Sequence, residues 1–490
     1  MTLPLGPIDI AVLGAYLAAA IGIGLKVGGK TKSLESYLLG DRDLAWWAIL
    51  GSIVATETSA ATVLSVPGEA YGATGMKFLQ LALGYIVGRA IIVRLLLPLY
   101  FRGQLLTAYE VLQQRFGGAT RQAASFVFLV TRNLGDGLRL FLAAIVLHRL
   151  AEVPMAWSVL IMGVISTAYT FWGGMRSIVW NDCVQFVVYM VGAIAAVFVI
   201  AGHISGGWSE LFRFAAEHDK FRVLDFNPAF NQDYTLWAGV IGGAVLTIGT
   251  HGTDHSMVQR YLSARSQSAA GWAVFLSGIV VFLQFTLFLF IGIELACYYA
   301  QNPGPVLKKD EVFADFIVHV FPQNTGLIGL MLAAILSSTL SSSLSASAAA
   351  LVNDFYLPCR KSLPTSEHLY FVTRGLTIAF GVVQVAIGIG AQFLNDSVVK
   401  NALTIAGFSA GLLLGVFALG VLTRRAGQTS ALVGGAAGLV VLLAVKFVLP
   451  GQGVAIAFPW LALIGASTTF GVGCFVSLFV PQQTPPGATS

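Results

Sequence analysis

The chain has 490 residues, of which 56% are hydrophobic and only 10% are charged, and its mean hydropathy is +0.80. About a quarter of the residues in a soluble globular domain are charged, so this composition excludes that class. It indicates a helical protein that crosses the membrane several times. The net charge of +5 does not point to a nucleic-acid partner, because basic residues in such a chain mainly mark cytoplasmic loops.

Hydrophobic runs recur along the chain at the length of about twenty residues that one bilayer crossing requires. Lys26, Lys30 and Lys32 follow the first run, and basic residues favour the cytoplasmic side. We therefore expect an external N-terminus and a cytoplasmic C-terminus in a cell membrane of the bacterial type, with long external loops at 203–234 and 300–324. We predict thirteen transmembrane helices and no appended domain, with the runs at 7–27, 46–71, 76–101, 122–150, 155–173, 178–203, 235–256, 271–299, 325–352, 369–393, 398–421, 429–448 and 455–480.

The sequence offers little for covalent chemistry. The four cysteines lie far apart and form no CxxC pair, which predicts neither a disulfide framework nor a metal site. His251 and His255 have the i, i+4 spacing of some zinc ligands, but no glutamate completes an HExxH motif. We therefore expect neither an enzyme nor a zinc-type metal centre.

The second run, ILGSIVATETSAATVLSVPGEAYG, combines an acid with hydroxyls in the middle of a predicted transmembrane helix. At that depth Glu57 costs about 2.5–3.5 kcal/mol unless it is paired or hydrated. One interpretation is a helix interrupted near Glu57, whose freed carbonyls could bind a cation. The other is structural, with an arginine such as Arg89 holding the carboxylate for packing alone. The hydroxyls concerned are those of Thr56, Thr58, Ser59 and Thr62.

The ninth run has a high density of hydroxyls, since eight of the thirteen residues from 335 to 347 are serine or threonine and none is charged. Residues three and four apart share one face of a helix, so these hydroxyls form a polar stripe. The stripe could serve close helix packing. It could also supply neutral oxygen ligands to a monovalent cation, together with carbonyls from a broken partner helix. Its members are Ser338, Ser341, Ser342 and Ser345, with Thr339 beside them.

Five motifs, in this order, resemble those of the sodium:solute symporter family, which includes sugar, proline, pantothenate and sialic acid symporters. They are ATETSAATVLSVPGEAYG, LTAYEVLQQRFG, YTFWGGMRSIVWNDCVQ, DHSMVQRYLSARS and the serine-rich run. The resemblance implies an all-α membrane protein with an inverted-repeat core of five plus five helices, of the leucine-transporter type. It places an extra helix and loop at 1–45, the first repeat at 46–203, an external loop at 204–234, the second repeat at 235–421 and two final helices with a short tail at 422–490.

The family's main sodium site corresponds here to three backbone carbonyls and two hydroxyls. The resemblance assigns the carbonyls to Ala55, Thr58 and Ile335 and the hydroxyls to Ser338 and Thr339. All five positions hold residues that can provide these ligands.

Some members resemble a two-sodium type, whose second site combines an aspartate with serines of the same stripe. That site would consist here of Asp182, Ser338, Ser341 and Ser342. The alternative for Asp182 is an acid in the first turn of its helix, where the helix dipole favours negative charge.

The residues expected to bind the solute include one informative departure from the family. An arginine that clamps the carboxylate in the sialic acid type aligns with Asp136 here, although Arg139 three residues on could take over that role. Sugar and inositol members carry an acid at this place, so the resemblance favours a sugar or polyol. The full predicted set is Glu57, Ser59, Thr62, Phe78, Arg89, Asp136, Arg139, Asp254 and His255.

The resemblance implies import of a small polar organic solute by alternating access, coupled to one or two sodium ions. Each sodium ion that enters at about 100 mV contributes roughly 2.3 kcal/mol, so a second ion would greatly increase the concentrating power. The alternatives are a symporter of an amino acid or carboxylate, a proton-coupled carrier that uses His255 or Asp182, and a sensor that binds solute without moving it. The expected partners are the solute and the lipid bilayer, and the sequence indicates no oligomeric state.

Overall fold

The computed structural model describes residues 5–28, 42–101, 109–170, 175–304, 307–337, 343–362, 364–394 and 396–480. Within these ranges the secondary structure is helical, apart from one isolated bridge between Leu44 and Ala264. Each of the thirteen predicted runs is occupied by helix where it is described. Seven described helices are long and apolar enough to cross a membrane, or up to nine if each of two bent pairs counts as one span. The other runs are shorter helices or helices interrupted by a break.

The helices of the first half are α1 (Pro7–Gly28), α3 (Trp46–Glu57), α4 (Val66–Tyr71), α5 (Leu79–Ile91), α6 (Leu97–Phe101), α7 (Glu110–Phe116), α8 (Gly118–Ala151), α9 (Met155–Thr170), α10 (Met175–His203) and α11 (Gly207–Glu217). Those of the second half are α12 (Gly243–Gly252), α13 (His255–Leu262), α14 (Gln267–Gln301), α15 (Val312–His319), α16 (Leu327–Ser337), α17 (Ser343–Leu351), α18 (Ser366–Ala391), α19 (Val398–Leu422), α20 (Gln428–Leu443) and α21 (Pro459–Ser477).

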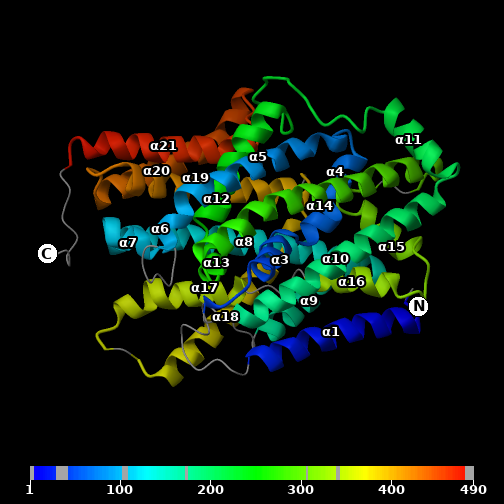
Figure 1. Cartoon of the computed structure of the whole chain (residues 1–490), viewed down its shortest axis with the longest axis horizontal. Helices are drawn as coiled ribbons and strands as arrows, with labels where there is room; N and C mark the ends of the chain where they lie inside the picture. The colour runs from blue at the N-terminus through cyan, green and yellow to red at the C-terminus, as the bar shows by residue number, and fades with distance from the viewer. Residues whose placement is uncertain are drawn as a thin grey trace.

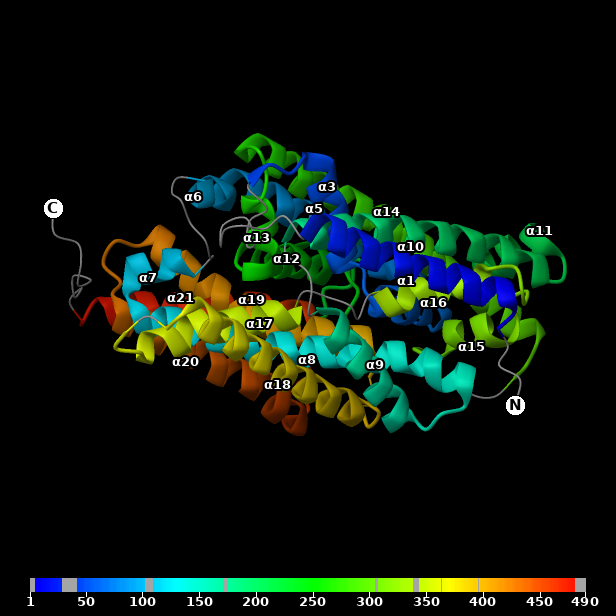
Figure 2. The ribbon, with the colours of Figure 1, turned by 90° about the horizontal axis from the view of Figure 1, so that it is seen from below.

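The two helices that lie nearest the centre are both discontinuous. Most helices run roughly along the long axis of the molecule, with α1 at one edge and α20 and α21 at the other (Figure 1). Seen from below, α3, α5 and α14 lie on one side, and α17, α18 and α20 lie on the other (Figure 2). Between these edges, α3 packs against α10 and α14, while α12 packs against α5 and α19. The centre of the molecule is therefore built from α3 with α4 and from α12 with α13.

The predicted interruption of the second run is confirmed. Helix α3 ends at Glu57, Thr58 has an extended conformation (φ −75°, ψ 103°), and the two halves of the run are bent by 63°. After the break the chain continues as a π-helix over Ala61–Ser65 and then as α4. No glycine lies at the break. Instead, hydroxyls satisfy the local backbone, since Thr58 Oγ1 donates to Val54 O (2.7 Å) and Thr62 Oγ1 accepts from Ser59 N (3.4 Å).

The second break separates α12 from α13 and is closed by an aspartate cap. Asp254 is the N-cap residue of α13, and its Oδ1 accepts from Ser256 N (2.8 Å) and Met257 N (3.4 Å). Such a cap satisfies amides that have no partner within the helix. The sequence analysis assigned Asp254 to the solute alone, and the structure adds this local structural role.

The loop between α10 and α12 is anchored on the end of α4 by a buried lysine. Lys220 is only 8% exposed, and its Nζ donates to the carbonyls of Ala70 (3.2 Å), Tyr71 (2.9 Å) and Gly72. Burial lowers the pKa of this ammonium group, whereas the negative end of the α4 dipole favours its charge. The loop thereby holds α4, the second half of the first broken helix.

We predict that Lys220→Met loosens this attachment. Hydrogen bonds from a charged group contribute about 1.5–3 kcal/mol, so the melting temperature of the purified protein should fall by several degrees, roughly 2–4 °C per kcal/mol. Limited proteolysis should cut residues 218–234 sooner. The matched control is Lys308→Met, because Lys308 is exposed in a neighbouring loop. Equal melting temperatures and cleavage rates for both variants would contradict the anchoring role.

Candidate functional site

A cavity of about 200 Å³ lies between the two broken helices. Its walls come from α3, α5, α8, α12, α14 and α19, and three aromatic rings close part of it: those of Phe78, Tyr85 and Phe285. The site residues predicted from sequence that line it are Glu57, Ser59, Thr62, Phe78, Asp136, Arg139 and Asp254. The structure therefore brings seven of the nine predicted solute contacts to one place.

Arg89 and His255 are the two predicted contacts that do not line this cavity. Arg89 is fully buried and forms an ion pair with Glu57, which supports its interpretation as the partner of that acid. His255 is buried in the first turn of α13, where its ring lies 6.1 Å from the ring of Tyr109. The prediction that these two side chains contact the solute directly does not fit this structure.

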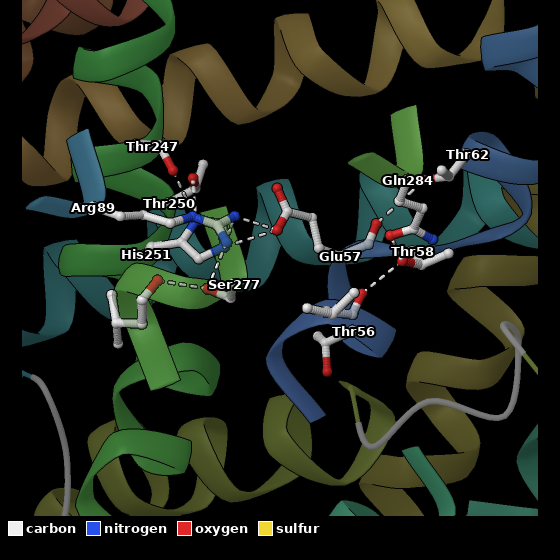
Figure 3. A network of polar contacts seen from close by, with 12 residues as sticks. Thr56, Glu57, Thr58, Thr62, Arg89, Thr247, Thr250, His251, Ser277 and Gln284 are labelled. Carbon is white, nitrogen blue, oxygen red and sulfur yellow. Dashed lines mark hydrogen bonds and ion pairs between the residues drawn. The ribbon is translucent and has the colours of Figure 1, made fainter. Parts of the chain in front are cut away.

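The Arg89 side chain has further partners around Glu57 (Figure 3). Its Nη1 donates to Ser277 Oγ of α14 (2.5 Å). Its Nη2 contacts the Glu57 carboxylate and also His251 Nε2 of α12 (3.2 Å). Sequence reasoning considered His251 only as a metal ligand and so missed this contact, because α5 and α12 lie far apart in the chain.

Asp136 is held between two arginines of its own helix, α8. Arg132 Nε donates to Asp136 Oδ2 (3.0 Å), and Arg139 Nη1 donates to Asp136 Oδ1 (3.3 Å). All three residues line the cavity. The sequence analysis missed Arg132, although its i, i+4 spacing to Asp136 places both on one helix face. The cluster has two guanidinium groups for one carboxylate, which leaves one positive charge in excess.

A second, larger cavity of about 670 Å³ lies next to the first, and ten of its 22 lining residues are charged. An aromatic layer separates the two, because Phe78 lines the smaller cavity and its ring lies 5.1 Å from that of Tyr234, which lines the larger one. In the larger cavity, Glu69 of α4 accepts from Lys309 Nζ (3.1 Å) and from Ser397 Oγ (2.5 Å). These bonds join α4 to the loop before α15 and to the start of α19.

The break in α3 provides the carbonyls expected for the main sodium site. In a continuous helix, Ser59 N would bond to Ala55 O and Thr62 N to Thr58 O. Here Ser59 N donates to Thr62 Oγ1 (3.4 Å) and Thr62 N donates to Ser59 O (2.8 Å). The carbonyls of Ala55 and Thr58 are thus released from the helical pattern.

The other half of the predicted sodium site is described only in part. Ile335 is buried in α16, which packs against α10, the same helix that packs against α3. Ser338 and Thr339 lie outside the described residues. Thr58 Oγ1 also lies 2.8 Å from Gln284 Oε1 of α14, a polar neighbour that the sequence did not suggest.

Asp182 of α10 has a partner that the sequence analysis missed. It accepts from Ser52 Oγ (2.5 Å) and from Arg260 Nη2 (3.4 Å). Since α10 begins at Met175, Asp182 lies beyond the first turn, and its interpretation as a first-turn acid is wrong. The stripe serines assigned to the second sodium site, Ser338, Ser341 and Ser342, lie outside the described residues.

Comparison with known proteins agrees with this arrangement. Residues 37–438 match the sodium:solute symporter family. The chain belongs to this family. It is 31% identical to the human sodium/iodide cotransporter over 89% of this chain and 69% of that protein, and 29% identical to the human sodium-coupled monocarboxylate transporter 1 over 89% and 72%. A solved structure of a sodium-coupled sialic acid symporter, substrate-bound and outward-open, aligns with a TM-score of 0.85 at 26% identity over 98% of this chain and 99% of that one.

These matches confirm several predictions. The symporter is a multi-pass, all-helical membrane protein with the leucine-transporter fold, and it is a sodium-coupled solute transporter rather than an enzyme. The proton-coupled and sensor alternatives are therefore not supported.

We predict that Thr58→Val weakens sodium binding to the symporter. The change keeps the side-chain volume but removes the hydroxyl that bonds to Val54 O and Gln284, so the break loses its fixed conformation. Sodium titrations followed by tryptophan fluorescence should show an affinity lower by about tenfold, which corresponds to one hydrogen bond of about 1.4 kcal/mol. Trp46 and Trp47 begin α3 and provide the signal. The control Thr286→Val removes a comparable hydroxyl from α14, and an equal loss in both variants would contradict the assignment.

Proposed function

We propose that the symporter imports a small organic anion, such as a monocarboxylate, together with sodium. The observation that carries the proposal is the Arg132–Asp136–Arg139 cluster on the cavity wall. Arginine binds carboxylates with two parallel hydrogen bonds. A solute carboxylate could therefore share these guanidinium groups with Asp136.

The charges of the remaining cavity acids are already compensated. Glu57 is paired with Arg89, and Asp254 binds the amides at the start of α13, where the helix dipole is positive. Asp254 is also close enough to attract Arg132 and Arg139, so the main feature that the α8 cluster offers to a solute is its guanidinium hydrogen-bond donors. The cavity, at about 200 Å³, is smaller than the roughly 300–1,000 Å³ typical of sites for drug-sized ligands, which suits a small solute.

The relatives also favour an anionic solute over a sugar or polyol. Two of them are described as transporting iodide and monocarboxylates, both anions. The sequence analysis favoured a sugar or polyol because an acid occupies position 136. In the structure that carboxylate accepts from two arginines and is poorly placed to accept from sugar hydroxyls. The carboxylate alternative is therefore the better proposal for this chain.

For the mechanism, we infer alternating access with the sodium ion at the α3 break. The ion would be held by the carbonyls of Ala55, Thr58 and Ile335 and by the hydroxyls of Ser338 and Thr339. Movement of the two broken helices against the rest of the fold would open the site to each side in turn. The repeats proposed for this motion are 46–203 and 235–421, in a bacterial-type cell membrane with the N-terminus outside.

We further propose that one sodium ion accompanies each solute. Arg260 lies beside Asp182 and provides a fixed positive charge where the two-sodium type would place its second ion. A carboxylate buried in the membrane, such as that of Asp182, needs one compensating positive charge, and here Arg260 supplies it. One sodium ion and one monocarboxylate together carry no net charge, so the membrane potential cancels and a tenfold sodium gradient provides roughly 1.4 kcal/mol, enough for about tenfold accumulation.

The solute proposal predicts that Arg139→Gln raises the KM for a carboxylate by about tenfold or more, since a charged hydrogen bond contributes about 1.5–3 kcal/mol. Uptake of labelled lactate into proteoliposomes under an inward sodium gradient measures this, with unlabelled pyruvate, acetate, glucose and inositol as competitors. Sodium affinity without solute should stay unchanged. Arg149→Gln is the control, because Arg149 lies on the same helix but pairs with Glu311. Competition by glucose or inositol but not by carboxylates would contradict the proposal.

The stoichiometry proposal predicts a sodium Hill coefficient of one, both for the wild type and for Asp182→Asn/Arg260→Gln. This double variant removes both charges and so leaves neither one buried without its partner. Sodium-dependent uptake at fixed solute concentration provides the coefficient. An independent test is the solute-induced current, which should be absent, because one sodium ion and one monocarboxylate carry no net charge, whereas a second sodium ion would make transport electrogenic. A wild-type coefficient near two that falls to one in the variant would instead establish the second sodium site.

A further inference from the structure

The two helix breaks of the symporter are joined by one arginine. Glu57 is the last residue of α3, and His251 lies in the last turn of α12. Arg89 Nη2 contacts both side chains, and Figure 3 shows Arg89 and His251 side by side at the Glu57 carboxylate, from which His251 Nε2 lies 3.4 Å. The two residues that end the first halves of the broken helices therefore share a single donor group on α5.

The helix packing around Arg89 leaves little space for movement. Two glycines border this region. A Cβ atom on Gly88 would lie 2.1 Å from Thr247 Cγ2 of α12, and one on Gly278 would lie 3.1 Å from Arg89 Cδ. Only glycine permits such an approach of α5 to α12 and α14. The guanidinium is thus held in place by close backbone packing as well as by Ser277 Oγ.

The electrostatics explain why a cation belongs here. The C-terminal ends of α3 and α12 each carry a partial negative charge, and Glu57 adds a full one. Arg89 lies at the meeting point of all three. His251 completes the arrangement: its Nε2 lies 3.2 Å from Arg89 Nη2 and 3.4 Å from the Glu57 carboxylate, and its Nδ1 faces Thr250 Oγ1 (3.0 Å). Thr250 Oγ1 in turn donates to Leu246 O (3.0 Å), which closes the chain of donors and acceptors.

We propose that Arg89 is a positioning residue that fixes the two helix breaks relative to each other, so that sodium at the first break also sets the position of the second. The inference rests on the proposed sodium site, because Ala55 and Thr58 lie on either side of Glu57. Sodium at their carbonyls fixes the Glu57 side chain, Arg89 transmits that position to His251, and α12 with Asp254 forms the opposite wall of the solute cavity. Sodium binding thereby shapes the solute site without contacting it.

A purely structural role would be charge compensation, in which Arg89 only neutralises Glu57. The two roles predict different sodium binding for a variant in which both Arg89 and Glu57 are replaced by neutral residues. If compensation were sufficient, Arg89→Gln/Glu57→Gln would restore wild-type behaviour, since no charge remains buried without a partner. If Arg89 positions the breaks, the double variant stays defective, because two amides cannot span Glu57, His251 and Ser277 at once.

The experiment measures sodium affinity of the purified full-length protein by tryptophan fluorescence, with no solute present. We expect Arg89→Gln and Arg89→Gln/Glu57→Gln both to weaken sodium binding by about tenfold, and His251→Ala by about threefold or more. His251→Gln should bind sodium as the wild type does, because its amide oxygen can still accept from Arg89. Size-exclusion profiles and melting temperatures identify the folded variants. The control is Glu294→Gln, which alters a fully buried carboxylate of α14 whose oxygens have no hydrogen-bond partner within the described residues.

Wild-type sodium affinity in His251→Ala would overturn the inference, because His251 touches none of the proposed sodium ligands and acts only through its contacts with Arg89 and Glu57. Restoration by the double variant would overturn it in favour of charge compensation. If Arg89→Gln fails to fold, the comparison of His251→Ala with His251→Gln decides alone. If the wild type itself shows no saturable sodium binding, that result contradicts the proposed sodium site. The identity of the solute does not enter any of these measurements.

Discussion

The interior of a bilayer offers no water to unpaired backbone groups, and the rest of this structure depends on that constraint. Every interruption of a membrane helix must supply its own partners for the amides and carbonyls it frees. At the first break Thr58 and Thr62 do this with hydroxyls, and at the second Asp254 does it with a carboxylate. The carbonyls of Ala55 and Thr58, which the first break releases from the helical pattern, are those proposed to bind sodium.

Charges at membrane depth follow the same principle. Glu57, Asp136 and Asp182 are each paired with arginine in the structure, and each pair has a different consequence. The first joins the two breaks, the second leaves an excess of positive charge on the cavity wall, and the third places a fixed cation beside a candidate ion site. A buried pair is weak evidence for stability by itself. Three such pairs surround one cavity and two helix breaks. A role in transport explains this arrangement better than a contribution to folding stability.

The larger cavity lies next to the central one, and the loops around it are attached to α4. Glu69, Lys309 and Ser397 connect α4 to two loops, and Lys220 holds the end of α4 from the other side. The aromatic rings of Phe78, Tyr234 and Phe285 separate this cavity from the smaller one. Helix α4, the second half of the first broken helix, is therefore attached to three loops. A rocking motion of this helix would have to break and remake these contacts.

Much of this could be predicted from the sequence, because it depends on local patterns. Hydrophobic runs determined the helices, and the motif order determined the family and hence the fold. The acid and hydroxyls of 56–62 marked the first break, and seven of the nine predicted solute contacts line one cavity. Helical periodicity within α8 could also have indicated Arg132, since it requires no knowledge of distant segments.

Only the tertiary structure decided which charges meet. Glu57 and Arg89 are 32 residues apart, Arg89 and His251 are 162 apart, and Asp182 and Arg260 are 78 apart. No periodicity connects such positions, because helix packing rather than chain distance brings them together. The sequence by itself determined that this chain has charges in the membrane, whereas the packing of α3, α5, α10 and α12 decided which of them are neutralised and which face the solute.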